Sequence, residues 1–203
     1  MKDLAAVFKE SKSLSGYSKD YFEYLGQCLS QVKDEELDKV WSIISKARSN
    51  GSTIFILGNG GSASTASHFA NDLNKYANLN TKKKIRAVSL TDNVSVVTAI
   101  ANDLSYGDIF KSQLEVFLKK NDVVIGISAS GNSENIIKAF SFAKMKGAVC
   151  IALVGFDGGK MKKMADACVH IKTGISEYGP AEDFHIIFDH VLTSYMNFRN
   201  KKK

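Results

Sequence analysis

Residues 53–76 read TIFILGNGGSASTASHFANDLNKY, in which an apolar run, a glycine-rich turn and an amphipathic segment follow one another directly. The apolar run, Thr53–Leu57, has the length and the bounding glycine of a buried strand. The amphipathic segment, Ser62–Tyr76, has the length of a helix. This part of the chain therefore predicts a strand, a tight turn and a helix that begins at the turn.

The same alternation continues toward the C-terminus. Further apolar runs predict strands at Arg86–Leu90, Asp122–Ile127, Val149–Val154 and Cys168–Ile171. Further helical stretches lie at Asn93–Ala101, at Ser133–Lys146 and at about Ala181–Phe198, with a glycine-rich turn after Val154. Short strands that alternate with longer helices are typical of α/β proteins with a parallel, doubly wound sheet, either flavodoxin-like or Rossmann-like. In such sheets ligands bind beyond the carboxyl ends of the strands, where the strand order reverses.

Helices are also predicted before the first strand, at about Lys19–Val32 and Asp34–Arg48. In the second of them apolar residues recur at helical spacing, and Asn50-Gly51 ends it. Because these helices precede every strand, we expect residues 1–51 to form an accessory, oligomerisation layer. Residues 52–203 would then form the sheet domain, and the two parts a single structural unit.

Composition limits the classes of function. The 203 residues, 44% apolar and 24% charged, suit one globular domain. No apolar run approaches the length of a membrane span or of a signal-peptide core. We therefore expect a cytoplasmic protein with no membrane partner. Three cysteines without a CxxC pair disfavour a disulfide framework and a thiolate metal site.

The net charge of +6 is concentrated in two places, the run Lys82–Arg86 and the tail Arg199–Lys203. These clusters hold eight of the 27 basic residues, so the rest of the chain has 19 basic against 21 acidic residues. A nucleic-acid-binding face usually spreads its basic residues along a recognition element, often with aromatic residues between them. The distribution favours a solvated loop and tail, and nucleic acid is not an expected partner.

Two predicted strand-to-helix turns have the composition of phosphate sites, GNGGSAS at residues 58–64 and SASGNS at residues 128–133. Glycine lets the backbone approach a ligand, and the free N–H groups and dipole of a helix N-terminus attract an anion. Hydroxyl donors without net charge come from Ser62, Ser128, Ser130 and Ser133. Together the turns predict a site for the phosphate monoester of a small metabolite, whereas either turn alone would also suit a capped helix without a ligand.

The first turn also fits G-x-G-x-x-A, a variant of the dinucleotide fingerprint. That fingerprint requires an acidic residue about twenty positions further on. The chain near residue 78 is rich in asparagine and leads into lysines, and Asp92 comes too late. We therefore expect no nucleotide cofactor.

Histidines and carboxylates occur together on two of the predicted helices. His68 and Asp72 are four residues apart and share a helix face. The C-terminal helix carries a second group, Glu182, His185, Asp189 and His190. His170 ends a short strand and is expected to pack there. Because the helix of His68 begins at the glycine-rich turn, a side chain one or two turns along it lies within a sugar phosphate's length of that turn.

Four motifs in order, GNGGSASTASHFANDL, SLTDNVSVVTAIANDLSYGDIF, GISASGNSENIIKA and LVGFDGGKM, resemble the sugar-isomerase (SIS) domain family and, within it, the phosphoheptose isomerase group. The resemblance covers nearly the whole chain. It implies a cytoplasmic homotetramer with active sites between subunits and one zinc ion per subunit. The implied reaction interconverts sedoheptulose 7-phosphate and D-glycero-D-manno-heptose 7-phosphate through an enediol, the first step toward the heptose of lipopolysaccharide.

By resemblance, the substrate contacts belong to the two turns and to a few residues outside them. They are Asn59, Gly60, Gly61, Ser62, Asn102, Asp103, Ser128, Ala129, Ser130, Ser133 and Glu182. The implied metal ligands are His68, Asp72, Glu182 and His190. The resemblance makes Asp72 the base and His190 the proton donor or relay, so these two are the expected catalytic residues.

Three positions depart from the family pattern. Asp72 stands where the family has a glutamate base, Glu182 where it has glutamine, and Ala129 where it usually has threonine. The shorter aspartate leaves open a shifted backbone, a base elsewhere or different chemistry. The alternatives to a phosphoheptose isomerase are an isomerase of another sugar phosphate and a non-catalytic regulator, as in the family member that associates with a replication initiator.

The spacing of two implied ligands raises a further question. Glu182 and His190 are eight residues apart, about 12 Å along a straight helix. One ion with bonds of about 2.1 Å cannot join them from the same helix. We therefore expect either that Glu182 precedes the first turn and folds back, or that neighbouring subunits share the site.

Overall fold

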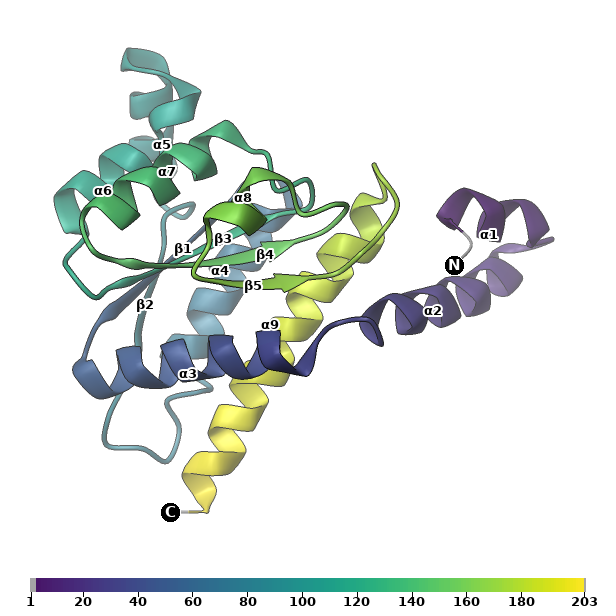
Figure 1. Cartoon of the computed structure of the whole chain (residues 1–203), viewed down its shortest axis with the longest axis horizontal. Helices are drawn as coiled ribbons and strands as arrows, with labels where there is room; N and C mark the ends of the chain where they lie inside the picture. The colour runs from purple at the N-terminus through teal and green to yellow at the C-terminus, as the bar shows by residue number, and fades with distance from the viewer. Residues whose placement is uncertain (1–2, 203) are drawn as a thin grey trace.

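The computed structural model describes residues 3–202, and the strands of this range form one sheet (Figure 1). The strands are β1 Thr53–Gly58, β2 Arg86–Ser89, β3 Val123–Ser128, β4 Val149–Val154 and β5 Ala167–His170. Their order across the sheet is β2-β1-β3-β4-β5, with every adjacent pair parallel. The order reverses between β1 and β3, as in the flavodoxin-like type of doubly wound sheet. The predicted fold class is confirmed.

Helices cover both faces of this sheet (Figure 1). They are α1 Leu4–Glu10, α2 Leu14–Leu29, α3 Asp34–Asn50, α4 Gly61–Asn74, α5 Val94–Asp103, α6 Lys111–Phe117, α7 Glu134–Met145, α8 Gly159–Met164 and α9 Tyr178–Lys201, with a 3-10 turn at Tyr106–Asp108. α3, α4 and α9 pack on one face, and α6, α7 and α8 on the other. The helices α1, α6 and α8, of 7, 7 and 6 residues, are too short to show helical periodicity, so the sequence analysis missed them.

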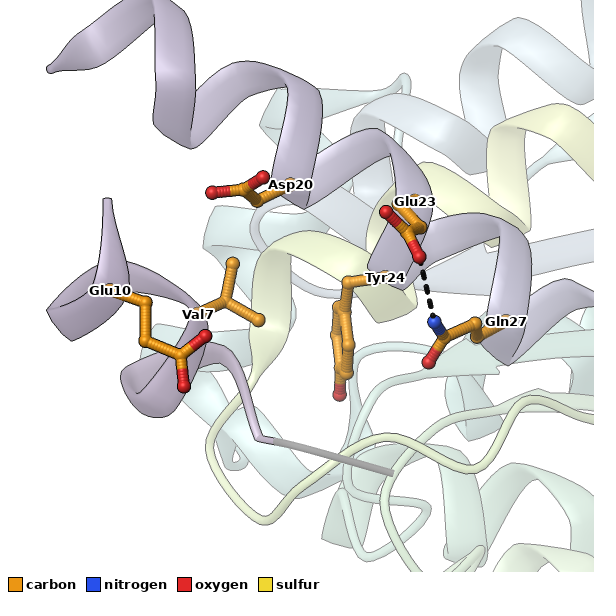
Figure 2. A pocket seen from close by; sticks show the side chains of 6 residues that line it. All are labelled: Val7, Glu10, Asp20, Glu23, Tyr24 and Gln27. Atoms are coloured by element: carbon orange, nitrogen blue, oxygen red, sulfur yellow. Dashed lines mark hydrogen bonds between the residues drawn. The ribbon is translucent and has the colours of Figure 1, made fainter. Parts of the chain in front are cut away.

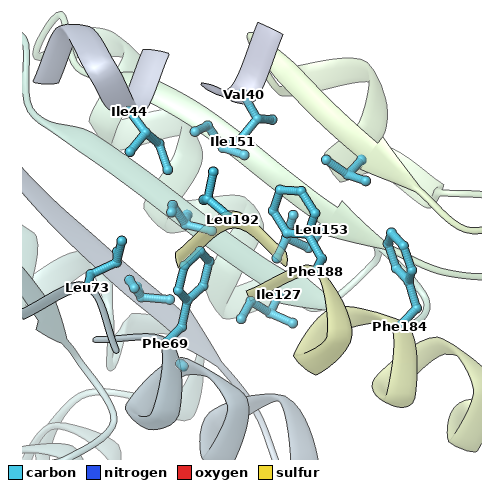
Figure 3. Packing of buried hydrophobic residues seen from close by; sticks show 14 of the residues in the cluster. Val40, Ile44, Phe69, Leu73, Ile127, Ile151, Leu153, Phe184, Phe188 and Leu192 are labelled. Carbon is cyan, nitrogen blue, oxygen red and sulfur yellow. The ribbon is translucent and has the colours of Figure 1, made fainter. Parts of the chain in front are cut away.

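The strands direct alternate side chains into two cores. On β1, Ile54 and Ile56 face the layer of α3, α4 and α9, whereas Phe55 and Leu57 face the opposite layer. Figure 3 shows the first of these cores, with labels on Val40, Ile44, Phe69, Leu73, Ile127, Ile151, Leu153, Phe184, Phe188 and Leu192. A fully buried side chain of this kind contributes roughly 1.5–3 kcal/mol. The core therefore holds α4 and α9, which carry the histidines of the expected site, against the sheet.

The N-terminal helices occupy two different positions (Figure 1). α3 packs on the sheet through Val40 and Ile44, and its Trp41 ring meets Tyr195 of α9 edge-on, with 5.1 Å between the ring centroids. α1 and α2 instead extend away from the sheet. The apolar stripe of α3 faces the strands, so α3 is part of the same core as the sheet. The expected boundary at residue 51 would divide that core. An oligomerisation role for α1 and α2 stays a prediction.

A cavity of about 260 Å³ lies between α1 and α2 (Figure 2). Its lining residues are Val7, Glu10, Asp20, Glu23, Tyr24 and Gln27. The hydroxyl of Tyr24 and the backbone N–H of Leu4 (2.6 Å) both donate to the Glu177 carboxylate, which ties α1 and α2 to the segment before α9. This cavity contains none of the expected site residues. Among the described helices, none combines the length and the apolarity that crossing a membrane requires.

Candidate active site

The two turns of phosphate-site composition meet at the carboxyl ends of β1 and β3, where the strand order reverses. They line a single cavity of about 180 Å³. Its lining residues are Asn59, Ser62, Ile127, Ser128, Ala129, Ser130, Ser133, Tyr178 and Glu182. Only Ile127 and Tyr178 of this set were not expected from the sequence. The cavity lies where doubly wound sheets bind their ligands.

The first turn requires glycine at two positions. Gly60 has φ +53° and ψ −126°, a conformation that residues with side chains avoid. A Cβ on Gly58 would lie 2.4 Å from the backbone oxygen of Ser62. No side chain caps α4, which begins directly after Gly60. The N–H groups of Gly61 and Ser62 are therefore available to an anion, whereas those of Ala63 and Ser64 donate to backbone oxygens of the turn.

Hydrogen bonds organise the second turn around its serines. The Ser128 hydroxyl lies 3.1 Å from that of Ser133 and accepts a hydrogen bond from the N–H of Gly131, also at 3.1 Å. The Ser130 hydroxyl accepts one from the N–H of Asn132 at 3.2 Å. Ser133 occupies the N-cap position of α7 without capping it through its side chain. Its hydroxyl and the first N–H groups of α7 can therefore both serve a phosphate.

Glu182 brings a carboxylate into the same cavity. A Cβ on Gly61 would lie 2.4 Å from Glu182 Oε2, which places the carboxylate against the start of α4. Negative charge is favourable at a helix N-terminus, but this carboxylate would repel a phosphate bound at the same turn. The serine turn is therefore the better of the two anchors for a phosphate group.

Asn59 is held in place by two residues that the sequence analysis missed. Its side-chain amide exchanges a pair of 2.9 Å hydrogen bonds with that of Asn135 on α7. The hydroxyl of Tyr106 donates to Asn59 Oδ1, also at 2.9 Å. Asn135 lies inside a quoted motif, but nothing local shows that it meets the first turn. These contacts join the two turns into one polar wall.

Asn102 and Asp103 do not line the cavity. They end α5, where the amide of Asn102 donates to the Asp103 carboxylate at 2.8 Å. Figure 1 shows α5 projecting from the body of the molecule, and none of its residues is buried. The two residues therefore take no part in the lining of this cavity in the single chain.

About two turns along α4 and α9 from the residues of the cavity, four side chains of these helices converge. They are His68, Asp72, Asp189 and His190, and one ligand atom from each lies within 4.8 Å of the others. The Nε2 atoms of the two histidines are 3.0 Å apart. His68 Nε2 lies 3.5 Å from Asp72 Oδ2 and 3.9 Å from Asp189 Oδ2. The fourth member of this cluster is Asp189, which the sequence analysis noted beside His190 without giving it a role.

Glu182 lies outside this cluster. It belongs to α9, which begins at Tyr178, so it does not precede the first turn and does not fold back toward His190. Of the two arrangements expected for Glu182 as a ligand, sharing between subunits is the one that this geometry leaves.

The donor set suits a divalent ion such as zinc. Tetrahedral zinc, with bonds of about 2.0–2.1 Å, places neighbouring ligand atoms about 3.4 Å apart. The separations of 3.0, 3.5 and 3.9 Å bracket that value. Asp189 is fully buried, and its burial, together with the nearby Asp72 charge, raises the pKa of the carboxyl to about 8. Two imidazoles and two carboxylates are ligands that zinc accepts.

The other two histidines are structural. His170 ends β5, and its Nε2 lies 3.0 Å from the backbone oxygen of Phe156, which confirms that it packs there. His185 on α9 is fully buried, and neither ring nitrogen has a hydrogen-bond partner within residues 3–202. Burial lowers the pKa of His185 to about 4. The ring is therefore neutral at physiological pH.

The buried ring of His185 predicts a loss of stability in acid. Between its ordinary pKa of 6.5 and its folded value of about 4, the unfolded chain takes up a proton that the folded chain does not. From pH 7 to pH 5 this costs about 2 kcal/mol of unfolding free energy. Urea unfolding of the wild type and of His185→Leu at both pH values should show a smaller loss in the variant. Equal losses in the two proteins would contradict the prediction.

Comparison with known proteins agrees with this architecture. The family model of the SIS domain matches residues 20–155. A phosphoheptose isomerase of Helicobacter pylori (strain Shi470) is 39% identical over 181 residues, which are 88% of this chain and 92% of that protein. A probable phosphoheptose isomerase of Thermoplasma acidophilum is 35% identical over 180 residues, 89% of this chain and 97% of that protein.

A solved structure gives the same result. The phosphoheptose isomerase of Neisseria gonorrhoeae superposes with a TM-score of 0.80 at 28% identity, and the match covers 91% of this chain and 99% of that one. On the family match, the relatives and the shared architecture, this chain belongs to the SIS-domain family.

Proposed function

We propose that this protein is a phosphoheptose isomerase, which interconverts sedoheptulose 7-phosphate and D-glycero-D-manno-heptose 7-phosphate. The observation that carries the proposal is that two helices connect the cavity to the His68–His190 pair. α4 runs from the glycine turn to His68, and α9 runs from Glu182 in the cavity to His190, about 10–12 Å along each helix axis. An aldose–ketose isomerase needs a phosphate anchor and, beyond it, groups that move protons. The names of the related proteins support the heptose as the substrate.

In the proposed mechanism, the residues of the two turns bind and orient the substrate. Ser128, Ser130 and Ser133 hold the phosphate, and this remote binding positions the reacting carbons at the histidines. The Asp72 carboxylate removes the proton next to the carbonyl. His190 protonates the carbonyl oxygen, directly or through a relay, which gives the enediol. Asp72 then returns its proton to the former carbonyl carbon while the neighbouring hydroxyl gives its proton to His190, which forms the carbonyl of the product.

Zinc would be held by His68, Asp72 and His190, whereas Glu182, the fourth ligand implied by family resemblance, lies outside this cluster in its own chain. When bound, it polarises the carbonyl of the substrate and stabilises the developing negative charge. Asp72 is one methylene shorter than the glutamate of the family, and its Oδ2 still lies 3.5 Å from His68 Nε2. The carboxylate thus reaches the cluster from its place on α4.

The proposed assembly is a cytoplasmic homotetramer with active sites between subunits. The supporting observation is α5, which buries no residue in its own chain and exposes Val94 at its start and Leu104 directly after Asp103. In the proposed assembly this helix carries Asn102 and Asp103 to the substrate cavity of a neighbouring subunit. Residues 1–51, through α1 and α2, add to the same contacts.

The direct test is incubation of the purified protein with sedoheptulose 7-phosphate, followed by product analysis with and without a metal chelator. We expect the manno-configured heptose 7-phosphate to form, and the chelator to reduce its rate of formation at least tenfold if zinc polarises the carbonyl. Turnover of a different sugar phosphate alone would reassign the substrate. The absence of turnover on every sugar phosphate tried would contradict an isomerase and favour a binding protein.

A further inference from the structure

Asp189 is the member of the histidine cluster that neither the sequence pattern nor the family positions account for. It precedes His190 on α9, and its carboxylate faces α4, where His68 and Asp72 lie one turn apart. Asp189 Oδ2 is 3.9 Å from His68 Nε2, close to the separation of two ligands of one metal ion. The carboxylate is therefore in position to complete a four-ligand site.

The environment of this carboxylate is unfavourable unless a cation is bound beside it. Asp189 has no exposed surface, and neither of its oxygens has a hydrogen-bond partner within the described part of the chain. A buried carboxylate without a partner destabilises a protein, and such groups are normally paired or bound to metal. The neighbouring Asp72 adds repulsion. A cation between the two helices would satisfy both carboxylates at once.

Because of where Glu182 lies, the fourth ligand of the metal site can be Asp189. Glu182 lies seven residues earlier on α9, about 10 Å along the helix axis, and its carboxylate contacts the start of α4 at Gly61. It therefore cannot reach the histidine pair of its own chain. Asp189 supplies a carboxylate where Glu182 does not.

We propose that Asp189 is a zinc ligand, so that His68, Asp72, Asp189 and His190 bind the ion within one subunit. The choice of zinc rests on the proposed function. In this arrangement Glu182 remains in the substrate cavity and takes no part in metal binding. The site is then complete without a ligand from a neighbouring chain.

The test compares Asp189→Asn with Glu182→Gln, a matched pair that exchanges a carboxylate for an amide at each competing position. Metal-free protein of each variant and of the wild type is titrated with Zn²⁺ against a chromophoric chelator, and with Co²⁺ while its visible absorption is recorded. We expect Asp189→Asn to weaken zinc binding about 100-fold or more and to change the Co²⁺ spectrum, since even residues that only orient a ligand cost 10–100-fold. Glu182→Gln should leave both unchanged.

Thermal unfolding separates a lost ligand from a damaged fold. Without metal, the apolar Asp189→Leu should be at least as stable as the wild type, because it removes a buried polar group that has no partner. Asp189→Asn keeps a buried unpaired polar group, so without metal its stability should stay close to that of the wild type. With Zn²⁺ added, the wild type and Glu182→Gln should gain more stability than the two Asp189 variants at the same zinc concentration. A merely structural Asp189 would give variants that are less stable with or without zinc.

The outcomes distinguish this inference from the proposed function. Loss of zinc binding in Glu182→Gln but not in Asp189→Asn would overturn the inference and leave the isomerase intact. A wild type that isomerises the heptose phosphate without binding zinc would also overturn it. Zinc binding that depends on Asp189, in a wild type that turns over no sugar phosphate, would support the metal site and overturn the proposed function.

Discussion

Replacing His190 with alanine is expected to lower kcat about 1000-fold or more while the affinity for the phosphosugar changes by less than about threefold. General acid–base groups contribute roughly 10²- to 10⁴-fold to catalysis, and His190 is also in the cluster proposed to hold the metal. The residue lies 3.0 Å from His68 and does not line the cavity of the serine turn. Because the side chain is exposed, its removal should leave the core of α9 intact.

Ser130→Ala is the reciprocal variant. Ser130 lines the cavity and accepts a hydrogen bond from Asn132, so its loss should weaken substrate binding about tenfold and affect KM more than kcat. Steady-state kinetics and calorimetric binding of the substrate at high protein concentration measure both effects. If each variant lost binding and turnover to the same degree, the division between an anchoring turn and a proton-transferring histidine would be wrong.

Gly131→Ala is expected to lower the unfolding free energy by about 3 kcal/mol and to weaken phosphosugar binding at least tenfold. Gly131 has φ +64°, and a Cβ there would lie 2.1 Å from the backbone oxygen of Gly158. The left-handed conformation costs a residue with a side chain about 1–2 kcal/mol, and forcing apart packed backbone costs about 1–3 kcal/mol more. Gly131 belongs to the serine turn. Displacing its backbone should therefore lower the stability of the fold and the binding of the phosphosugar together.

Gly51→Ala is the matched control for this effect. Gly51 has φ +70°, but nothing lies within 4 Å of a Cβ placed on it, and it ends α3 far from the turn in sequence. The alanine substitution should lower the unfolding free energy only by the conformational part, about 1 kcal/mol, and leave phosphosugar binding unchanged. Urea unfolding and calorimetry on both variants make the comparison. Equal effects of the two alanines would show that the contact with Gly158 is unimportant.

Local pattern was enough for most of the fold. Each strand of the sheet was predicted to within about two residues, because a buried parallel strand is a short apolar run bounded by turn residues. The short α6 and α8 were missed for the opposite reason, since a helix of two turns has no period to detect. The packing of α3 on the sheet, apart from α1 and α2, was not predicted either. An apolar stripe shows that a helix packs on something, but it does not identify the element on which the helix packs.

The candidate site divides in the same way. The glycine and serine turns were predicted because their composition is dictated locally, by positive φ and by the donors that an anion needs. Tyr106 and Asn135, which hold Asn59, could not be assigned, since their contacts join residues 47 and 76 positions apart. The pairing of His68 with His190 came from family resemblance, and the structure brings their Nε2 atoms together across 122 positions.

The order of strands and helices, and with it the end of the sheet at which ligands bind, was written in the spacing of apolar residues, glycines and serines along the chain. The spacing did not determine which carboxylate lies beside the histidines. Glu182 and Asp189 lie on one helix, and only the angle and depth at which α9 packs on α4 turn Asp189 toward His68 and leave Glu182 at Gly61. Hydrophobic burial over many residues sets that packing, so no local motif reveals it.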